Sequence, residues 1–185
     1  MKFEPLSLSG AYLVHLGMFE DERGYFARSW CTNEFRDAGL DATLVQCSFS
    51  FNRQKGTLRG MHYQIPPFAE TKLVRCTRGG LFDVIIDVRP DSPSFLKWVG
   101  AELTPDNGRM LYIPKGCAHG FMTLSDNTEI SYQMSEFYSP VHARGCRWDD
   151  PLFGIAWPGS VNVISQKDLH QPDSHRSDFE SLRGL

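Results

Sequence analysis

Residues 72–89 read KLVRCTRGGLFDVIIDVR, and this stretch decides the fold class. From position 82 onward an apolar residue occupies every second position, and three of the four residues between them are charged. A period of two places alternate side chains on opposite faces of a strand. Residues 82–89 are therefore predicted to form a half-buried β-strand, with most of its charges on one face.

The same stretch is predicted to contain a hairpin. Residues 73–77, LVRCT, are followed by Gly79 and Gly80, a pair suited to the positive backbone angles of a hairpin turn. Beyond residue 89, polar turns separate four more short strand candidates: WVGAEL (98–103), RMLYI (109–113), HGFMTL (119–124) and EISYQM (129–134). Regular short strands with polar turns predict an antiparallel barrel or sandwich.

Helices are predicted to be few and short. One is expected from Thr32 to Ala38, where Thr32 can cap the first turn and Gly39 can end the last one. Another is expected near Asp178. The 185 residues suffice for a single domain, 1–185, and the polar segment from about residue 172 is expected to be a loose tail.

Charge and cysteine content exclude several classes of protein. A net charge of −3 gives no broad basic field, so nucleic acid is not an expected partner. The five cysteines are odd in number and contain no CxxC pair, which predicts reduced, buried thiols. The first residues show no basic start followed by an apolar run, and no segment approaches the length of a membrane span. These features predict a cytoplasmic protein with no membrane partner.

Cationic side chains and an imidazole gather in one short stretch. Residues 56–72, GTLRGMHYQIPPFAETK, hold Arg59, His62 and Lys72, and His119 lies in a second tight turn further along the chain. Neighbouring cationic groups make one another costly to charge unless an anion binds between them. The pattern therefore predicts an anionic substrate.

Six motifs together resemble the dTDP-4-dehydrorhamnose 3,5-epimerase family over nearly the whole chain. They are DERGYF (21–26), GTLRGMHYQ (56–64), KLVRC (72–76), DVRPDSPSF (87–95), IPKGCAHGF (113–121) and RWDDP (147–151). The resemblance implies an all-β, cupin-type jelly roll with short peripheral helices, and a homodimer. It also implies epimerisation of a nucleotide-diphospho-4-keto-6-deoxyhexose at carbon 3, carbon 5 or both, without metal or cofactor, in deoxysugar and cell-surface polysaccharide biosynthesis.

Four residues receive catalytic roles from this resemblance. Hydrogens beside a ketone are weakly acidic, so inversion needs a base, a group that stabilises the enolate oxygen, and an acid on the opposite face. By similarity His62 is the base and Asp168 orients it. Lys72 stabilises the enolate, and Tyr132 returns the proton.

The resemblance also implies the residues that bind the substrate. Guanidinium groups match phosphate oxygens well, so Arg59 and His119 are expected to hold the diphosphate together with Arg23. Part of the amino-terminal segment is expected to reach the partner subunit's site. The full set of expected substrate-binding residues is Phe19, Arg23, Phe26, Arg28, Gln46, Ser48, Arg59, His119 and Tyr138.

Three departures from the family pattern lie near the expected ligand. Arg28 stands where Glu is usual, Ala143 stands where an acidic residue is common, and Ser48 lies in QCSFS (46–50) where the family has QxNxS. Arg28 can only donate hydrogen bonds, so it would suit the acceptors of cytosine better than thymine. A CDP-linked sugar is therefore an alternative substrate, unless Arg28 simply turns outward into solvent.

Two other classes of protein compete with the epimerase reading. The order His62, Gln64, Glu70 and His119 imitates a metal-binding cupin enzyme, although the amide at Gln64 is a poor ligand for iron or zinc. A non-catalytic sugar-binding cupin is the second alternative. An intact base, acid and lysine would serve no purpose in a protein that only binds.

Overall fold

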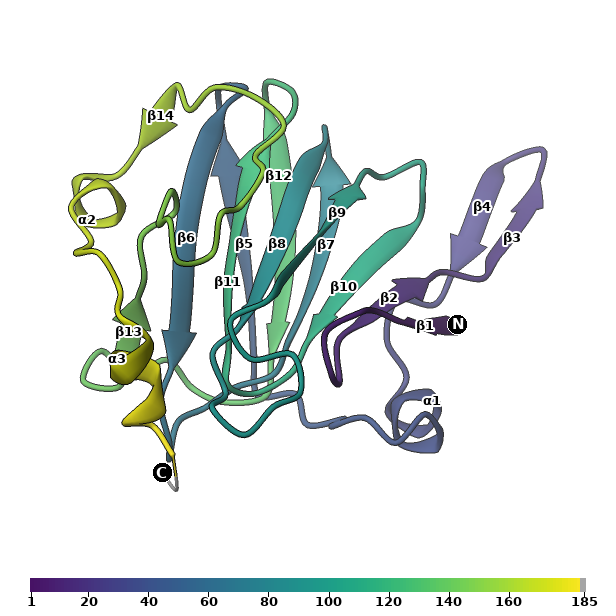
Figure 1. Cartoon of the computed structure of the whole chain (residues 1–185). Coiled ribbons are helices and arrows are strands. Elements are labelled where there is room, and N and C mark those ends of the chain that lie inside the picture. The colour runs from purple at the N-terminus through teal and green to yellow at the C-terminus, as the bar shows by residue number, and fades with distance from the viewer. Residues whose placement is uncertain (184–185) are drawn as a thin grey trace.

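The computed structural model describes residues 1–183 and consists of two antiparallel sheets that face one another (Figure 1). The first sheet has six strands, in the order β1 (Lys2–Pro5), β2 (Tyr12–His15), β10 (Arg109–Ile113), β7 (Lys72–Arg78), β12 (Thr128–Met134) and β5 (Gln46–Asn52). The second has the order β13 (Ala143–Gly145), β6 (Thr57–Gln64), β11 (Cys117–Thr123), β8 (Leu81–Asp87) and β9 (Trp98–Leu103), and β14 (Val163–Ile164) pairs with β6. The predicted all-β sandwich is confirmed.

Short elements surround the two sheets. The strands β3 (Met18–Asp21) and β4 (Gly24–Ala27) form a separate two-stranded hairpin, called the arm below, which projects away from the sheets at the right of Figure 1. The helices are α1 (Thr32–Asp37), α2 (Gln166–Leu169) and α3 (Arg176–Glu180). Within residues 1–183, no helix combines the length and the apolar character that crossing a bilayer requires.

Both predicted helices exist, with small differences. The first begins at Thr32, but its N-cap is Cys31 and no side chain caps it. Gly39, with a φ of 72°, ends it as expected. The second is α3, and its Phe179 is buried against the second sheet. The segment from about residue 172, expected to be a loose tail, thus contains a helix with one buried aromatic side chain.

The hairpin predicted at Gly79 and Gly80 is wrong. Gly79 does adopt a positive φ of 77°, but β7 and β8 belong to different sheets and do not pair. The turn instead carries the chain from one sheet to the other. Strand β7 pairs with β10 and β12, which are distant in the sequence, and β8 pairs with the next strand, β9, and with the more distant β11.

Strand β8 is buried on both faces rather than on one. Its apolar residues Val84 and Ile86 pack outward against the C-terminal segment, while Leu81 and Ile85 belong to the core between the sheets. The charged residues do share one face, as predicted, but that face points inward. Asp83 and Asp87 are both fully buried. Buried carboxylates need hydrogen-bond partners. Asp87 has Arg89 and two serines, and Asp83 has His119.

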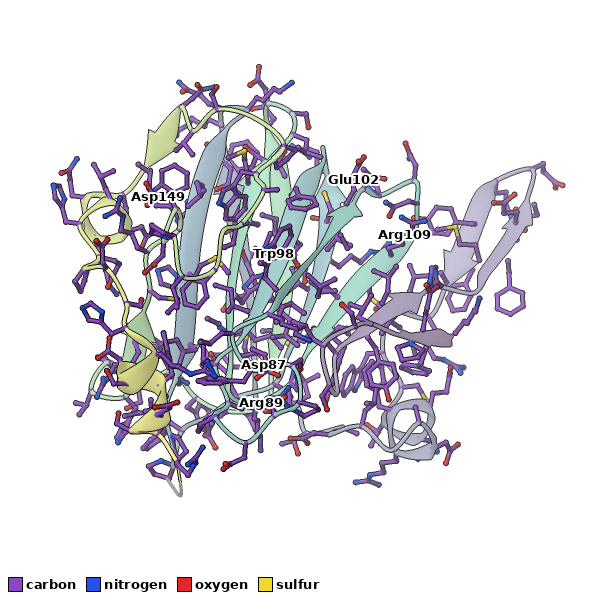
Figure 2. The ribbon with its side chains drawn as sticks, viewed as in Figure 1. Asp87, Arg89, Trp98, Glu102, Arg109 and Asp149 are labelled. Atoms are coloured by element: carbon purple, nitrogen blue, oxygen red, sulfur yellow. The ribbon has the colours of Figure 1, made fainter. Side chains whose placement is uncertain are left out.

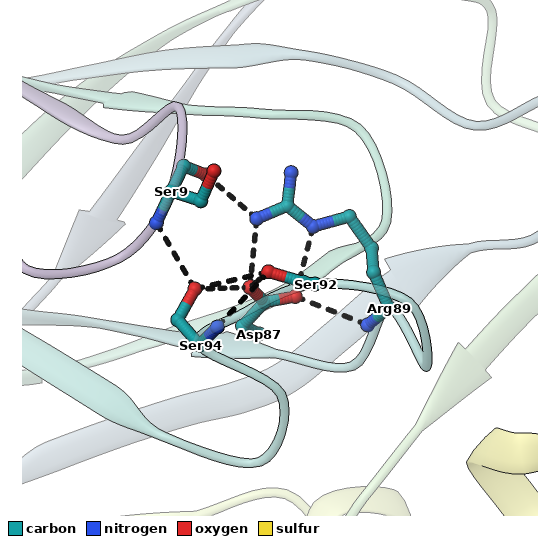
Figure 3. A network of polar contacts seen from close by, with 5 residues as sticks. All are labelled: Ser9, Asp87, Arg89, Ser92 and Ser94. Atoms are coloured by element: carbon teal, nitrogen blue, oxygen red, sulfur yellow. Dashed lines mark hydrogen bonds and ion pairs between the residues drawn. The ribbon is translucent and has the colours of Figure 1, made fainter.

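Asp87 anchors a network of polar contacts at the end of β8, where it lies beside Arg89 (Figures 2 and 3). Its Oδ1 accepts from Arg89 Nε at 2.8 Å, and its Oδ2 accepts from Ser94 Oγ at 2.6 Å and from Ser92 Oγ. Arg89 Nη2 also donates to the carbonyl of Ser9 at 2.6 Å. The network ties the loop between β8 and β9 to the amino-terminal segment.

This network is expected to make the protein sensitive to acid. Burial raises the pKa of Asp87, but the hydrogen bonds from Arg89, Ser92 and Ser94 outweigh that effect and hold the pKa below its ordinary value of about 3.9. A lowered folded-state pKa stabilises the fold above the ordinary value, and this stabilisation is lost as the pH falls through the folded-state pKa. Asp87→Asn should lower the free energy of unfolding at pH 7 by about 1–3 kcal/mol.

Urea unfolding followed by tryptophan fluorescence between pH 3 and 7 would measure this effect. The difference between wild type and Asp87→Asn should begin to shrink below about pH 4, where the carboxylate of the unfolded chain becomes protonated, and should continue to shrink toward the lowered folded-state pKa. Asp106→Asn, at an exposed position, is the matched control and should change little. A difference that stays constant with pH would contradict the assignment to this carboxylate.

Three of the five cysteines match the expectation of buried thiols. Cys76, Cys117 and Cys146 are buried, and all five cysteines are free. Cys47 is exposed on β5, and Cys31 is partly exposed. Cys47 lies on the outer face of β5, which ends its sheet, so the expectation of burial is wrong for this cysteine.

Candidate functional site

A cavity of about 710 Å³ opens between the two sheets. Its lining comes from strands of both sheets together with β14 and α2. Nine of the thirteen residues predicted to form the site line it: Gln46, Ser48, Arg59, His62, Lys72, His119, Tyr132, Tyr138 and Asp168.

A β-bulge in β6 brings Arg59 and His62 to the same cavity. Residues three apart on a regular strand face opposite sides of the sheet. Here His119 of β11 is opposite His62, but Phe121 is opposite Arg59, so the register shifts by one residue. Gly60, with a φ of 127°, lies at the shift, and a Cβ there would lie 2.5 Å from the Cα of Gly120. A bulge of this kind redirects side chains beside a site.

His62 and Asp168 form a hydrogen-bonded pair at the cavity wall. His62 Nε2 lies 2.7 Å from Asp168 Oδ1, and the backbone N–H of Gly60 donates to Asp168 Oδ2 at 3.3 Å. Asp168 is buried on α2, whose N-cap Ser165 accepts a hydrogen bond from the Asp168 backbone N–H. Burial raises the pKa of Asp168, but the bonds from His62, Gly60 and Ser165 outweigh it and leave the pKa lowered. Asp168 is therefore held as a carboxylate.

Lys72 pairs with Glu70, which the sequence analysis considered only as a possible metal ligand. Its Nζ lies 2.9 Å from Glu70 Oε1, and the side chains of both residues are largely buried. The other carboxylate oxygen of Glu70 accepts from Gln64 Nε2 at 3.1 Å. The pair fixes the ammonium group of Lys72 at the cavity. The short spacing of Glu70 and Lys72 could have indicated this contact.

Tyr132 lies on β12, across the cavity from the β6 strand. It is packed beside the core between the sheets, and burial raises the pKa of its phenol well above the ordinary value. Its ring centroid lies 6.3 Å from that of His119. A neutral phenol at this position can donate a proton, and its apolar surroundings disfavour the phenolate.

Arg59 and His119 supply a guanidinium group and an imidazole to the wall. Arg59 Nε donates to Asn52 Oδ1 at 2.8 Å, and His119 Nε2 lies 2.6 Å from Asp83 Oδ1. Asp83 Oδ2 is buried and has no hydrogen-bond partner within residues 1–183. Neither Asn52 nor Asp83 was predicted to belong to the site. Asp83 was missed because its face of β8 was taken as the solvent-exposed one.

Four predicted substrate-binding residues lie outside the cavity of their own chain. Phe19, Arg23 and Phe26 belong to the arm, and Arg23 forms an ion pair with Asp21 at 2.5 Å. Arg28 follows the arm and donates to Glu34 Oε1 at 2.9 Å. Ala143, one of the departures from the family pattern, begins β13 and does not line the cavity either.

The residues that imitated a metal site each have protein partners. Gln64 Nε2 donates to the carbonyls of Phe68 and Phe137 as well as to Glu70. Glu70 is paired with Lys72, and His119 with Asp83. Among the residues that the structure describes, no group of three or more His, Cys, Asp or Glu side chains could hold a metal ion.

An antiparallel sandwich with this inner cavity is a cupin-like fold, and comparison with known proteins identifies its family. The model of the dTDP-4-dehydrorhamnose 3,5-epimerase family matches residues 5–175. A protein of that name from Sinorhizobium fredii is 50% identical over 173 residues, covering 93% of this chain and 89% of the relative. The chain belongs to the dTDP-4-dehydrorhamnose 3,5-epimerase family, which consists of isomerases.

Solved structures agree with this assignment. The epimerase of Bacillus anthracis, with TDP and PPi bound, is 38% identical with a TM-score of 0.90, covering 94% of this chain and 99% of its own. The epimerase of Legionella pneumophila, in complex with dTDP-4-keto-L-rhamnose, is 36% identical with a TM-score of 0.85, covering 90% of this chain and 89% of its own.

Proposed function

We propose that this protein epimerises a dTDP-linked 4-keto-6-deoxyhexose at carbons 3 and 5. This is the reaction for which its family and its relatives are named. The observation that carries the proposal is that the His62–Asp168 pair, Lys72 and Tyr132 line one cavity. The cavity has room for a sugar, and its wall holds Arg59 and His119 for a diphosphate.

In this proposal His62 removes the proton beside the ketone. The carboxylate of Asp168 can only accept a hydrogen bond, so His62 Nε2 carries the hydrogen and Nδ1 keeps the lone pair that takes the substrate proton. Asp168 also stabilises the imidazolium that forms. The electron pair of the broken C–H bond moves into the enolate, whose oxygen the ammonium group of Lys72 stabilises.

Tyr132 then completes the inversion. Its phenol gives a proton to the same carbon from the opposite face, so the new C–H bond has the reverse configuration. Both carbon 3 and carbon 5 flank the carbon 4 ketone, and the same set of groups can serve each in turn. The intact acid and base distinguish this proposal from a protein that only binds sugar.

Incubation of the wild-type protein with dTDP-4-keto-6-deoxyglucose in deuterated water tests the function. Proton NMR should show deuterium entering at carbons 3 and 5 and a product with inverted configuration. If the sugar binds but neither carbon exchanges, the proposal of epimerase activity is wrong. Exchange at a single carbon would restrict it to a mono-epimerase.

The base of the nucleotide is proposed to be thymine rather than cytosine. Support comes from the ligands named for the two solved relatives, which are TDP and a dTDP-sugar. Arg28, the basis of the CDP alternative, donates to Glu34, so its guanidinium already has an acceptor. A charge-assisted bond of this kind would have to break before Arg28 could meet a base.

Competitive binding of dTDP, UDP and CDP to the purified protein, measured by calorimetry, should therefore favour dTDP. Arg28→Glu should not reverse the order. A preference for CDP that Arg28→Glu turns into a preference for dTDP would establish the opposite assignment. Unpaired donors or acceptors on the wrong base should weaken binding by about 1–3 kcal/mol.

The protein is also proposed to act as a homodimer in which the arm completes the partner subunit's site. The arm exposes Phe19 and Phe26, 72% and 70% accessible, on a hairpin whose strands pair with neither sheet. Strand β5 ends its sheet and exposes Phe49, which is 70% accessible. Exposed aromatic residues beside an unpaired strand edge mark a surface that another chain covers.

Mixing two inactive variants separates a shared site from a dimer with independent sites. Arg23→Ala removes a group on the arm, and His62→Ala removes the base in the cavity. If the arm serves the partner, a mixed dimer contains one intact site, and subunit exchange should restore roughly a quarter of wild-type activity. A mixture of His62→Ala with Asp168→Asn is the control, since both changes lie in the same cavity. No recovery in the first mixture, with mixed dimers present, would contradict the shared site.

A further inference from the structure

Strand β5 presents a row of polar side chains to the cavity beside Tyr132. Its burial alternates, with Cys47, Phe49 and Phe51 exposed and the residues between them turned inward. Ser50 is one of these inward residues, and its Oγ lies 3.0 Å from Tyr132 Oη. Strands β5 and β12 are paired, with Tyr132 opposite Ser48, so the contact is a diagonal one between neighbouring strands.

The direction of this hydrogen bond follows from the groups behind Ser50. Asn52 Oδ1 accepts from Arg59 Nε at 2.8 Å, and arginine can only donate. Asn52 Nδ2 donates to the carbonyl of Thr128 at 3.3 Å, and a carbonyl can only accept. Both contacts fix the same orientation of the Asn52 amide. Asn52 is 2% exposed, so water does not compete for these bonds.

With its amide fixed in this way, Asn52 is a donor toward Ser50. Its Nδ2 lies 3.4 Å from Ser50 Oγ, which therefore accepts. A serine hydroxyl has one hydrogen, and among the residues that the structure describes Tyr132 Oη is the one acceptor that it reaches. The chain of contacts then reads Arg59, Asn52, Ser50, Tyr132, and each member donates to the next.

We infer that Ser50 is a positioning residue that donates a hydrogen bond to the phenol oxygen of Tyr132, so that the phenol keeps its own proton for the substrate. The inference rests on the proposed epimerase function. When Tyr132 gives up its proton, its O–H bond breaks and the new C–H bond forms with the electron pair of the enolate. The phenolate that remains accepts the hydrogen bond from Ser50 and regains a proton from water before the next turnover.

The surroundings of Tyr132 make such a donor necessary. Burial disfavours the phenolate, and the hydrogen bond from Ser50 opposes that effect. Hydrogen bonds to charged groups are stronger than those between neutral groups. Ser50 therefore contributes more after the proton has left than before, which is the condition for speeding reprotonation.

The chain also connects the acid to the expected diphosphate site. Arg59 holds Asn52 with its Nε and keeps its remaining N–H groups for an anion. Substrate bound to Arg59 would hold Asn52 and, through it, Ser50 in their donor orientation. Loss of Asn52 should therefore affect the Tyr132 step although Asn52 itself does not line the cavity.

Ser50→Ala, Ser50→Thr and the control Ser131→Ala test the inference. Two rates are compared for each: deuterium entry at the sugar, which reports the His62 step, and formation of the inverted product, which reports the Tyr132 step. Ser50→Ala should slow inversion about ten- to a hundredfold relative to exchange, since it removes a hydrogen bond to a charged group. Ser50→Thr keeps a hydroxyl and should recover most of the loss. Ser131 precedes Tyr132 on β12 and does not line the cavity, so Ser131→Ala should have no effect.

The pH profile gives a second readout that a purely structural role would not change. Without the donor the phenolate is less stable, so the alkaline limb of kcat/KM should move to higher pH in Ser50→Ala and return in Ser50→Thr. Equal loss of exchange and inversion, or no change in either, would overturn the inference. If Ser50→Ala does not fold, Asn52→Ala with the same two rates decides in its place. Absence of exchange in the wild type would instead refute the epimerase function itself.

Discussion

His62→Ala is expected to abolish solvent exchange at both carbons that flank the ketone. His62 is the imidazole whose second nitrogen is held by the carboxylate of Asp168 at 2.7 Å, and its side chain is 42% exposed at the cavity. Removal of a general base lowers the rate by about a hundredfold to ten-thousandfold. Deuterium entry measured by NMR should fall by that factor at carbon 3 and at carbon 5 alike.

The matched control for this variant is His15→Ala. His15 also pairs with a carboxylate, Glu4 at 2.9 Å, but it lies on β2 and does not line the cavity. Binding of dTDP should survive in both variants, because the expected phosphate ligands Arg59 and His119 are unchanged. Full exchange in His62→Ala would assign the base elsewhere. Loss at one carbon alone would mean that a second group deprotonates the other.

The sequence indicated the strands well and their partners poorly. Periodicity depends on local burial, so the four later strands were placed correctly to within two residues. Partner strands are set by contacts between distant segments. This is why Gly79 and Gly80 looked like a hairpin turn but join strands of different sheets.

Periodicity also does not say which face is the inner one. In β8 the charged face was expected to meet solvent, yet it points into the sandwich, where Asp83 meets His119. In β5 the same inversion occurs, because exposed Phe49 and Phe51 alternate with polar residues that face the cavity. Polar residues line a site for a charged ligand, and apolar residues can lie outside where another subunit covers them. The alternation of polar residues with Phe49 and Phe51 could have indicated that Ser50 faces the site.

The catalytic pair required the resemblance to a known family. His62 and Asp168 are 106 residues apart, and no local pattern connects them. The structure brings Asp168 to His62 through the short β14 strand beside β6, followed at once by α2. The bulge at Gly60 was equally hidden, since a regular strand would have separated Arg59 from His62.

Tyr132→Phe is expected to separate exchange from inversion. The variant keeps the ring in its packed position but removes the only group proposed to give a proton from the face opposite His62. Deprotonation should continue, because His62, Asp168 and Lys72 are unchanged, and the imidazolium can return deuterium to the face from which it took hydrogen. Inverted product should fall by about a hundredfold or more.

A variant in which inversion keeps pace with exchange would mean that water or another residue delivers the second proton. The comparison is informative because phenylalanine preserves the packing beside His119 and removes only the phenol oxygen that Ser50 contacts. If dTDP binding and thermal stability match the wild type, the loss belongs to the chemical step. Exchange without inversion would then show that one face of the sugar meets a histidine and the other a tyrosine.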